Sequence, residues 1–265
     1  MKKTKTNQLK KITVPDNGNL LLKKVLHNIN HNQEILALWK VINVNAIDRL
    51  GMTDHGRDHF QIVSNVSLKI SRMLVKRGVA MSTVKDYGLS NDYAEVIIFL
   101  ASVLHDLGMT ISRKDHESFS LFLANNLLHQ ILEFLPIEEK TIVISETLHA
   151  IISHRSDGKP LTIEAGIVRV GDALDMSKGR SRIAYETKKL DIYSVSAAAI
   201  NKVEIEDGQN KPIQLNVEMN NSAGIFQLDE LLKKKIIGSG IEQYLDVHAY
   251  VNQETETGLV KEYFL

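Results

Sequence analysis

The feature that most constrains the fold is an uncharged, mostly apolar run, residues 96–104, that ends directly on His105 and Asp106. A run of this kind predicts a buried helix, with Asn91 and Asp92 as capping residues at its start. An ionisable pair at the end of a buried helix costs free energy unless a partner compensates its charge. A divalent cation would bind both side chains, so this pair is the first candidate for metal ligation.

The composition is that of an ordinary globular protein. The chain has 265 residues, with 43% hydrophobic and 24% charged side chains, which is enough for one large domain or two modest ones. Lys plus Arg and Asp plus Glu are equal at 32 each, so no overall charge favours nucleic acid or a membrane surface. We therefore expect nucleic acid to be an unlikely partner and expect no membrane association.

The cysteine count and the lack of a targeting segment limit the chemistry and the location. The chain has no cysteine, which excludes disulfides, thiolate zinc sites and cysteine nucleophiles. The basic start lacks the apolar segment of a signal peptide. No apolar run approaches the roughly 20 residues that cross a bilayer. These features predict a cytoplasmic protein.

Apolar residues recur at helical spacing over residues 19–190. Pro136 and Pro160 fall between the periodic segments and predict breaks there. The lysine-rich start, residues 1–12, lacks such a pattern and is expected to be a flexible arm. The segments predicted to be helical are 20–29, 35–42, 60–74, 91–104, 118–135, 137–153 and 163–174.

The pattern changes to period two in the last quarter of the chain. The alternating segments are 202–206, 212–219, 243–251 and, as an edge strand, 259–265. Asp207 and Gly208 form a turn signal between the first two, which predicts a hairpin, and residues 226–237 have helical spacing. We expect a mainly α protein, with a helical domain at 13–190 and a small α+β domain at 191–265. Hairpin strands can pair between two copies, so a homo-oligomer is left open.

Two adjacent ligands do not complete a coordination sphere, and further candidates lie on separate predicted helices. His59 ends the segment Asp54-His55-Gly56-Arg57-Asp58-His59, and Asp172 follows Gly171 downstream. Gly171 and Ala173 are small enough to allow close approach of their helix. A set of two histidines and two aspartates suits Mn²⁺, Fe²⁺, Co²⁺, Ni²⁺ or Zn²⁺.

The order His, His-Asp, Asp on helices resembles the HD superfamily of metal-dependent phosphohydrolases, in particular an archaeal-type group within it. The resemblance covers nearly the whole chain, from about residue 12 to 251. It depends on the following segments: ITVPDNGNL, LGMTDHGRDHFQIVSN, LHDLGMTISRKDHESFS, LHAIISHR, LTIEAGIVRVGDALDMSKGRSR and MNNSAGIFQLDELL. This ordered set of ligand positions and matching segments identifies the superfamily far more specifically than the His-Asp dipeptide alone.

The resemblance implies that His59, His105, Asp106 and Asp172 bind a metal. His55 is the alternative to His59, one helical turn earlier, and Asp175 is the alternative to Asp172. Some members of the superfamily bind two ions through two further histidines. The candidates for those histidines here are His116 and His154, with His149 as the alternative to His154; the other interpretation of these residues is proton transfer beside a single ion. His129 and His248 are expected to be ordinary residues.

Basic residues follow the predicted ligands and are expected to bind phosphate. These candidate substrate-binding residues are Arg155, Lys178, Arg180 and Arg182. The expected function is hydrolysis of a phosphomonoester or phosphodiester, with a nucleotide as the expected substrate. The metal would lower the pKa of bound water from near 16 toward about 7. Asp106 would bind metal and orient the nucleophile, and His116 or Glu117 would transfer a proton to the leaving oxygen.

Other functions are compatible with the same residues. A regulatory module would hold a nucleotide in this site without turnover. A di-iron oxygenase would use the same scaffold for oxidation, which iron content and oxygen uptake would reveal. A nuclease is disfavoured by the zero net charge, because nucleases usually need a basic track.

Overall fold

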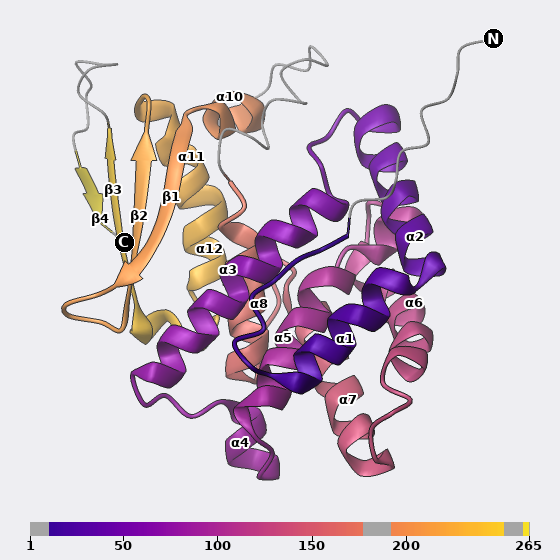
Figure 1. Ribbon diagram of the computed structural model, residues 1–265. Helices are drawn as coiled ribbons and strands as arrows, with labels where there is room; N and C mark the ends of the chain where they lie inside the picture. Colours follow the sequence, from indigo (N-terminus) through magenta and orange to yellow (C-terminus); the bar gives the residue numbers. More distant parts are fainter. Residues whose placement is uncertain (1–10, 177–191, 252–261, 265) are drawn as a thin grey trace.

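The computed structural model describes residues 11–176, 192–251 and 262–264 (Figure 1). Up to residue 176 the described chain is helical and forms no strand. The helices are α1 (Leu20–His31), α2 (Gln33–Asn43), a π-helix (Val44–Arg49), α3 (Arg57–Lys76), α4 (Ser82–Tyr87), α5 (Asn91–Leu104), a 3₁₀ turn (Leu107–Thr110), α6 (His116–Ile131), α7 (Ile137–Ser153) and α8 (Ile163–Ala173).

Helix α5 forms the centre of the helical part (Figure 1). Its apolar run is buried on all sides, because α1, α3, α7 and α8 pack around it. The segment Asn91–Thr110 is long and apolar enough to cross a membrane, and 83% of its apolar window is buried inside the protein. It therefore serves as the core helix that the sequence predicts.

The start of the described chain differs from the predicted arm. Ile12 is fully buried, and its backbone N–H and C=O both bond to the side chain of Asn30 on α1, at 2.8 Å each. Ile12 is therefore not part of the flexible arm predicted for residues 1–12, and residues 1–10 of that prediction lie outside the described residues. A buried isoleucine whose backbone groups are satisfied by an asparagine belongs to the core.

The C-terminal α+β unit, residues 192–251 and 262–264, contains a four-stranded sheet in the order β1-β2-β3-β4. The strands β1 and β2 form the predicted antiparallel hairpin, while β2 and β3 are parallel and β4 is an antiparallel edge strand. The elements are α10 (Ile192–Ala198), β1 (Ile200–Asp207), β2 (Ile213–Met219), a 3₁₀ turn (Ser222–Gly224), α11 (Ile225–Gln227), a π-helix (Leu228–Lys233), α12 (Lys234–Ile236), a 3₁₀ turn (Glu242–Tyr244), β3 (Leu245–Val251) and β4 (Glu262–Phe264). The expected mainly α fold with a small α+β part is confirmed.

Helices α11 and α12 lie between the sheet and the helical part, and α12 packs on α8 (Figure 1). A Cβ atom added at Gly166 of α8 would come within 2.2 Å of the backbone oxygen of Ser239, so only glycine allows this approach. Arg169 of α8 is buried, and its guanidinium donates to the backbone oxygens of Gly158, Ser156 and Lys234. One side chain of α8 therefore connects the α7–α8 loop to α12.

Candidate metal centre

Three helices of the central bundle end at one cluster of histidines and carboxylates. His105 is the C-cap residue of α5, His154 is the C-cap residue of α7, and Asp172 lies in the last turn of α8. His59 lies in the first turn of α3, and His116 begins α6. Helix C-termini carry partial negative charge and N-termini partial positive charge, so the three C-termini and two N-termini offset each other in part, and the case for a cation depends on the side chains.

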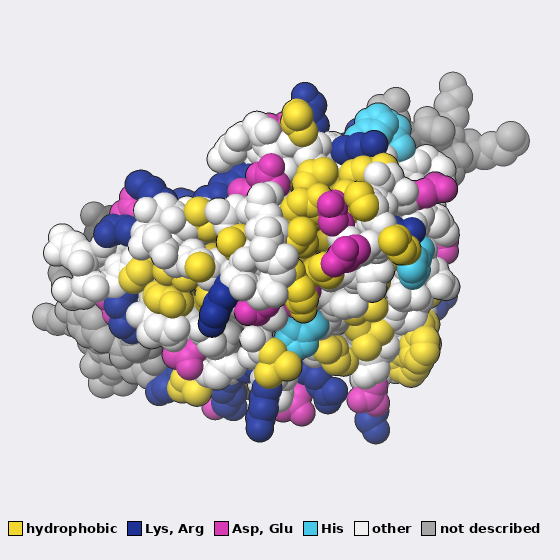
Figure 2. Space-filling view, turned by 90° about the horizontal axis from the view of Figure 1, so that it is seen from below, with side chains coloured by type: hydrophobic (Ala, Val, Ile, Leu, Met, Phe, Trp, Pro, Cys, Tyr) yellow, Lys and Arg dark blue, Asp and Glu magenta, His cyan; other side chains and the backbone are white. Residues whose placement is uncertain are grey.

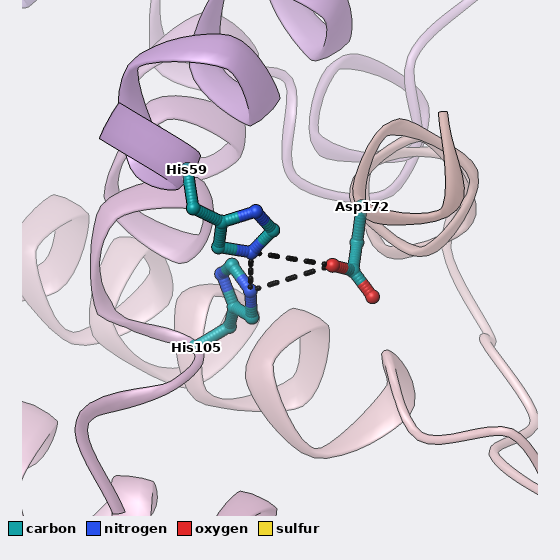
Figure 3. A group of neighbouring side chains, drawn as sticks. All are labelled: His59, His105 and Asp172. Atoms are coloured by element: carbon teal, nitrogen blue, oxygen red, sulfur yellow. Dashed lines mark hydrogen bonds and ion pairs between the residues drawn. The ribbon is translucent and has the colours of Figure 1, made fainter. Parts of the chain in front are cut away.

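His59, His105 and Asp172 form the innermost group (Figure 3). The Nε2 atoms of His59 and His105 lie 3.1 Å apart. Asp172 Oδ1 lies 3.4 Å from His59 Nε2 and 3.7 Å from His105 Nε2. Figure 3 shows the three ligand atoms pointing toward one another from three different helices. The predicted ligands from three separate helices are thus brought together.

The second ring nitrogen of each histidine fixes the tautomer. Nδ1 of His59 donates to Asp175 Oδ2 at 2.6 Å, that of His105 to the Ser102 carbonyl at 3.0 Å, and that of His154 to the Ile151 carbonyl at 2.6 Å. Because these acceptors are oxygens without a proton to give, the hydrogen must lie on Nδ1. Each Nε2 then presents a lone pair to the centre of the cluster, as a metal ligand requires.

Two facing lone pairs repel each other unless a cation lies between them. With both rings neutral and protonated at Nδ1, the Nε2 atoms of His59 and His105 would face each other in this way, since they lie 3.1 Å apart and both side chains are buried. Around Zn²⁺, bonds of about 2.0–2.1 Å place tetrahedral ligand atoms about 3.3–3.4 Å apart. The observed separations of 3.1, 3.4 and 3.7 Å fit such an ion. The donor set and its spacing therefore suit a divalent transition metal.

Asp106 presents its two carboxylate oxygens to different histidines. Oδ2 lies 3.6 Å from His105 Nε2 and 3.8 Å from His59 Nε2. Oδ1 lies 3.1 Å from His116 Nε2 and 3.7 Å from His154 Nε2. This carboxylate thus joins the innermost group to a second group of possible ligands that His116, Glu117 and His154 form.

The cluster keeps both aspartates ionised despite burial. Burial alone would raise the pKa of Asp106, but His105, the hydrogen bond from His116 and the charge of His55 together hold this pKa well below its usual value. Burial would also raise the pKa of Asp172, and here the Lys235 ammonium, together with His59 and His105, lowers it well below the usual value. Both carboxylates are therefore available as anionic ligands.

The histidines differ in how the protein shifts their pKa values. Burial lowers the pKa of His105, and burial with the nearby charge of Lys235 lowers that of His154 well below its ordinary value. Burial opposes protonation of His116 too, but the hydrogen bond to Asp106 and the charges of Asp106 and Glu117 raise its pKa overall. His105 and His154 are thus held neutral, which is the state that binds a metal.

The alternative ligands that the sequence left open occupy different positions around the cluster. Asp175 contacts the outer nitrogen of His59, so it orients that histidine, while Asp172 faces the centre. His149 accepts a hydrogen bond at Nε2 from the Leu161 backbone N–H, so it turns away from the cluster. His55 is buried beside His59 and donates through Nδ1 to the Thr53 carbonyl at 2.7 Å.

The carboxylate of Asp175 gives a direct test of ligand orientation. Replacing Asp175 with asparagine removes the charge that holds His59 in its metal-binding tautomer. Outer partners of this kind are worth about 10- to 100-fold in metal affinity. We expect a loss of this size in a competition titration against a chelator. The control is Asp157→Asn, an exposed carboxylate that pairs with Arg155, and an equal affinity in both variants would contradict the assignment.

Gly108 allows the turn after Asp106 to pack against α6. A Cβ atom added there would lie 1.9 Å from the His116 backbone oxygen and 2.7 Å from the Ser120 backbone nitrogen. Gly108 does not have a positive φ, so glycine is required here for the close approach of the two backbones. Ser120 completes the contact by donating to the His105 carbonyl at 2.6 Å and accepting from the Gly108 N–H at 2.8 Å.

The basic residues predicted to bind substrate are not all placed. Lys178, Arg180 and Arg182 lie outside the described residues. Arg155 donates through Nε to Asp157 at 2.9 Å, and its side chain is 36% exposed. Their roles in phosphate binding remain predictions.

Among the described residues, two cationic side chains reach the cluster: Arg113, whose Nη1 atom lies 3.1 Å from His116 Nδ1, and Lys235, which the sequence did not predict. Lys235 of α12 lies 3.1 Å from Asp172 Oδ2. It belongs to the run Lys233-Lys234-Lys235, and Lys233 and Lys234 form exposed pairs with acidic residues four positions before them. A lysine run predicts solvated charge, so the sequence offers no local signal that one of the three is nearly buried.

The fold and this cluster define a mainly helical protein with buried histidine and aspartate groups arranged for metal binding. No protein-family model matches the chain, and no solved structure matches it. The uncharacterized protein MJ1020 of Methanocaldococcus jannaschii is 43% identical over 233 residues, which cover 88% of this chain and 90% of that protein. The chain belongs to the same family as this archaeal protein.

Proposed function

We propose that this protein is a metal-dependent phosphohydrolase of the HD type that binds two divalent ions. The observation that carries the proposal is Asp106, whose two oxygens face two different pairs of histidine Nε2 atoms. A carboxylate in this arrangement can bridge two ions. Paired ions stabilise both the attacking and the leaving oxygen when a phosphate ester is hydrolysed.

Each ion would have its own ligands from this chain. His59, His105, Asp172 and Asp106 Oδ2 would hold the first ion. His116, His154 and Asp106 Oδ1 would hold the second. When bound, the ions supply a hydroxide nucleophile at neutral pH and neutralise charge on the phosphoryl oxygens. The mixed nitrogen and oxygen donors favour Mn²⁺, Fe²⁺, Co²⁺, Ni²⁺ or Zn²⁺ over Mg²⁺.

Proton transfer and substrate binding would use residues around these ligands. With His116 bound to an ion, Glu117 is the group that gives a proton to the leaving oxygen, since its carboxylate lies 3.2 Å from His116 Nδ1. If only one ion binds, His116 takes this role. Arg155, Lys178, Arg180 and Arg182 are the proposed phosphate-binding residues.

A small phosphorylated compound, with a nucleotide as the expected class, is the proposed substrate. Basic and acidic side chains are interspersed on the described part of the face that Figure 2 shows, and no basic track is visible on that face. A nucleic-acid-binding face usually gathers basic residues in a track. We propose a cytoplasmic location, in keeping with the buried position of the apolar helix and with a chain that has no cysteine.

The test compares two histidines of the same helix. His154 faces Asp106, whereas His149, one turn earlier on α7, faces the Leu161 backbone. After reconstitution with Mn²⁺, Ni²⁺ or Zn²⁺, we expect His154→Ala to retain one ion where the wild type holds two, and to lose phosphoester hydrolysis. His149→Ala should keep both ions and turnover. Metal analysis and a screen of nucleotides and generic phosphoesters measure these outcomes.

Other outcomes would favour other functions. Near-zero metal in the reconstituted wild type would reject the centre. Iron with oxygen uptake and no hydrolysis would favour a di-iron oxygenase. Tight nucleotide binding without turnover would favour a regulatory module, and an equal metal content in the two alanine variants would reject His154 as a ligand.

A further inference from the structure

Lys235 reaches the candidate metal centre from the C-terminal α+β unit. Its Nζ atom lies 3.1 Å from Asp172 Oδ2 and donates to the backbone oxygen of His154 as well. Its side chain is 14% exposed and that of Asp172 is 17% exposed, whereas His59 and His105 are at most 1% exposed. The ammonium group therefore lies at the solvent-facing side of the innermost ligands.

The backbone around Lys235 is fixed by contacts that do not involve its own side chain. Arg169 donates to the carbonyl oxygen of Lys234 at 2.8 Å, and Ile236 is buried. Just beyond α12, the close approach of Ser239 to Gly166 anchors the chain on α8. The position of Lys235 is thus determined by the docking of α12, and the ion pair with Asp172 is not needed to hold the helix in place.

Metal binding would change the charge balance around this lysine. In the metal-free protein, Asp172 is the carboxylate that compensates the nearly buried ammonium. An ion bound to Asp172 would share the negative charge that otherwise compensates the Lys235 ammonium. An ammonium group with too little compensating charge raises the free energy of the protein when it lies away from bulk water. Lys235 has three N–H donors, of which the described residues accept two. An anionic oxygen near the ion would satisfy the third donor and restore the balance.

We infer that Lys235 binds an anionic phosphoryl oxygen of the substrate, so that the C-terminal α+β unit supplies an anion-binding residue of the centre. The inference rests on the proposed function, because it takes the ions at Asp172 and Asp106 as bound. The C-terminal unit is then part of the binding site and determines that the ligand must be anionic.

The test measures the binding of inorganic phosphate to the metal-loaded full-length protein by calorimetry. Lys235→Met keeps the aliphatic length and removes the charge. We expect phosphate to bind about 10- to 100-fold more weakly to this variant, as the loss of a charge-assisted hydrogen bond predicts. Lys235→Arg should recover part of the affinity. The matched control is Lys234→Met, the neighbouring lysine that forms an exposed pair with Glu230 and should leave phosphate binding unchanged.

Metal content and thermal unfolding of each variant separate the possible roles. Unchanged metal content with weakened phosphate binding supports the inference. Equal phosphate affinity in Lys235→Met and the wild type overturns it. Loss of metal or of the folded state in both Lys235→Met and Lys235→Arg, with Lys234→Met intact, overturns it in favour of a structural tether. A wild type that takes up no metal is a failure of the proposed function, seen before any phosphate is added.

Discussion

Replacing Asp106 with alanine is expected to reduce the metal content of the reconstituted protein from two ions to fewer than one. Among the residues that the structure describes, Asp106 is the one whose oxygens face both pairs of histidines, so its loss removes a ligand from each group at once. The remaining histidines would then present lone pairs without an anionic ligand between the two groups. Hydrolysis of any substrate found in the screen should fall to background. Metal analysis after gel filtration measures the first effect directly.

A second substitution at Asp106 distinguishes two roles of its carboxylate: a ligand that bridges two ions, and a negative charge that only attracts them. Asp106→Asn keeps the shape and one oxygen, so it can still serve one pair of histidines. We expect this variant to hold at most one ion. Circular dichroism should show that both variants retain helix. If Asp106→Asn binds two ions as tightly as the wild type, Asp106 does not bridge them.

The second large effect is on folding, at Gly108. Replacing Gly108 with alanine places a Cβ atom 1.9 Å from the backbone oxygen of His116, and neither backbone can retreat without separating the turn from α6. Overpacking of a tight core usually costs about 1–3 kcal/mol, and a clash between two backbones belongs at the top of this range or above it. We expect the free energy of unfolding to fall by about 3 kcal/mol or more, measured by denaturant titration.

The control is a glycine with open surroundings. Gly78 follows α3 with a φ of +81°, and an added Cβ would meet no atom within 4 Å. Gly78→Ala should therefore lower the free energy of unfolding by about 1–2 kcal/mol, which is the cost of a left-handed backbone conformation for a residue with a Cβ atom. A smaller loss at Gly108 than at Gly78 would contradict the role assigned to close approach.

Local sequence patterns predicted most helices and strands correctly, because the apolar spacing within a segment indicates the secondary structure of that same segment. The helix expected at 137–153 is found as α7, Ile137–Ser153, and the hairpin around Asp207 and Gly208 is found as β1 and β2. The parallel pairing of β2 with β3 was not predicted, because alternation is the same in parallel and antiparallel strands. The helix expected at 226–237 contains a π-helical turn, Leu228–Lys233, which apolar spacing alone does not reveal.

The candidate site was predictable to the extent that its residues carry a local signal. His105 and Asp106 are conspicuous because they end an apolar helix, and the structure brings them together with His59 and Asp172. Asp175 was considered from the sequence only as an alternative ligand to Asp172, and its contact with His59 was not predicted; Lys235 carried no signal at all. Each acts on a residue far away in the sequence or on another helix, and only the packing of α3 and α12 against α8 shows the contact.

The depth of the cluster affects how the protein would acquire its metal. The side chains of His59, His105, Asp106 and Asp172 are between 0% and 17% exposed, so a bound ion would have little contact with bulk solvent, and its release would require several of these ligands to dissociate together. Exchange would then be slow compared with that of a surface site. The ion found after purification would report which metal was abundant while the chain folded, and an equilibrium preference would emerge only after refolding or prolonged warming with competing metals.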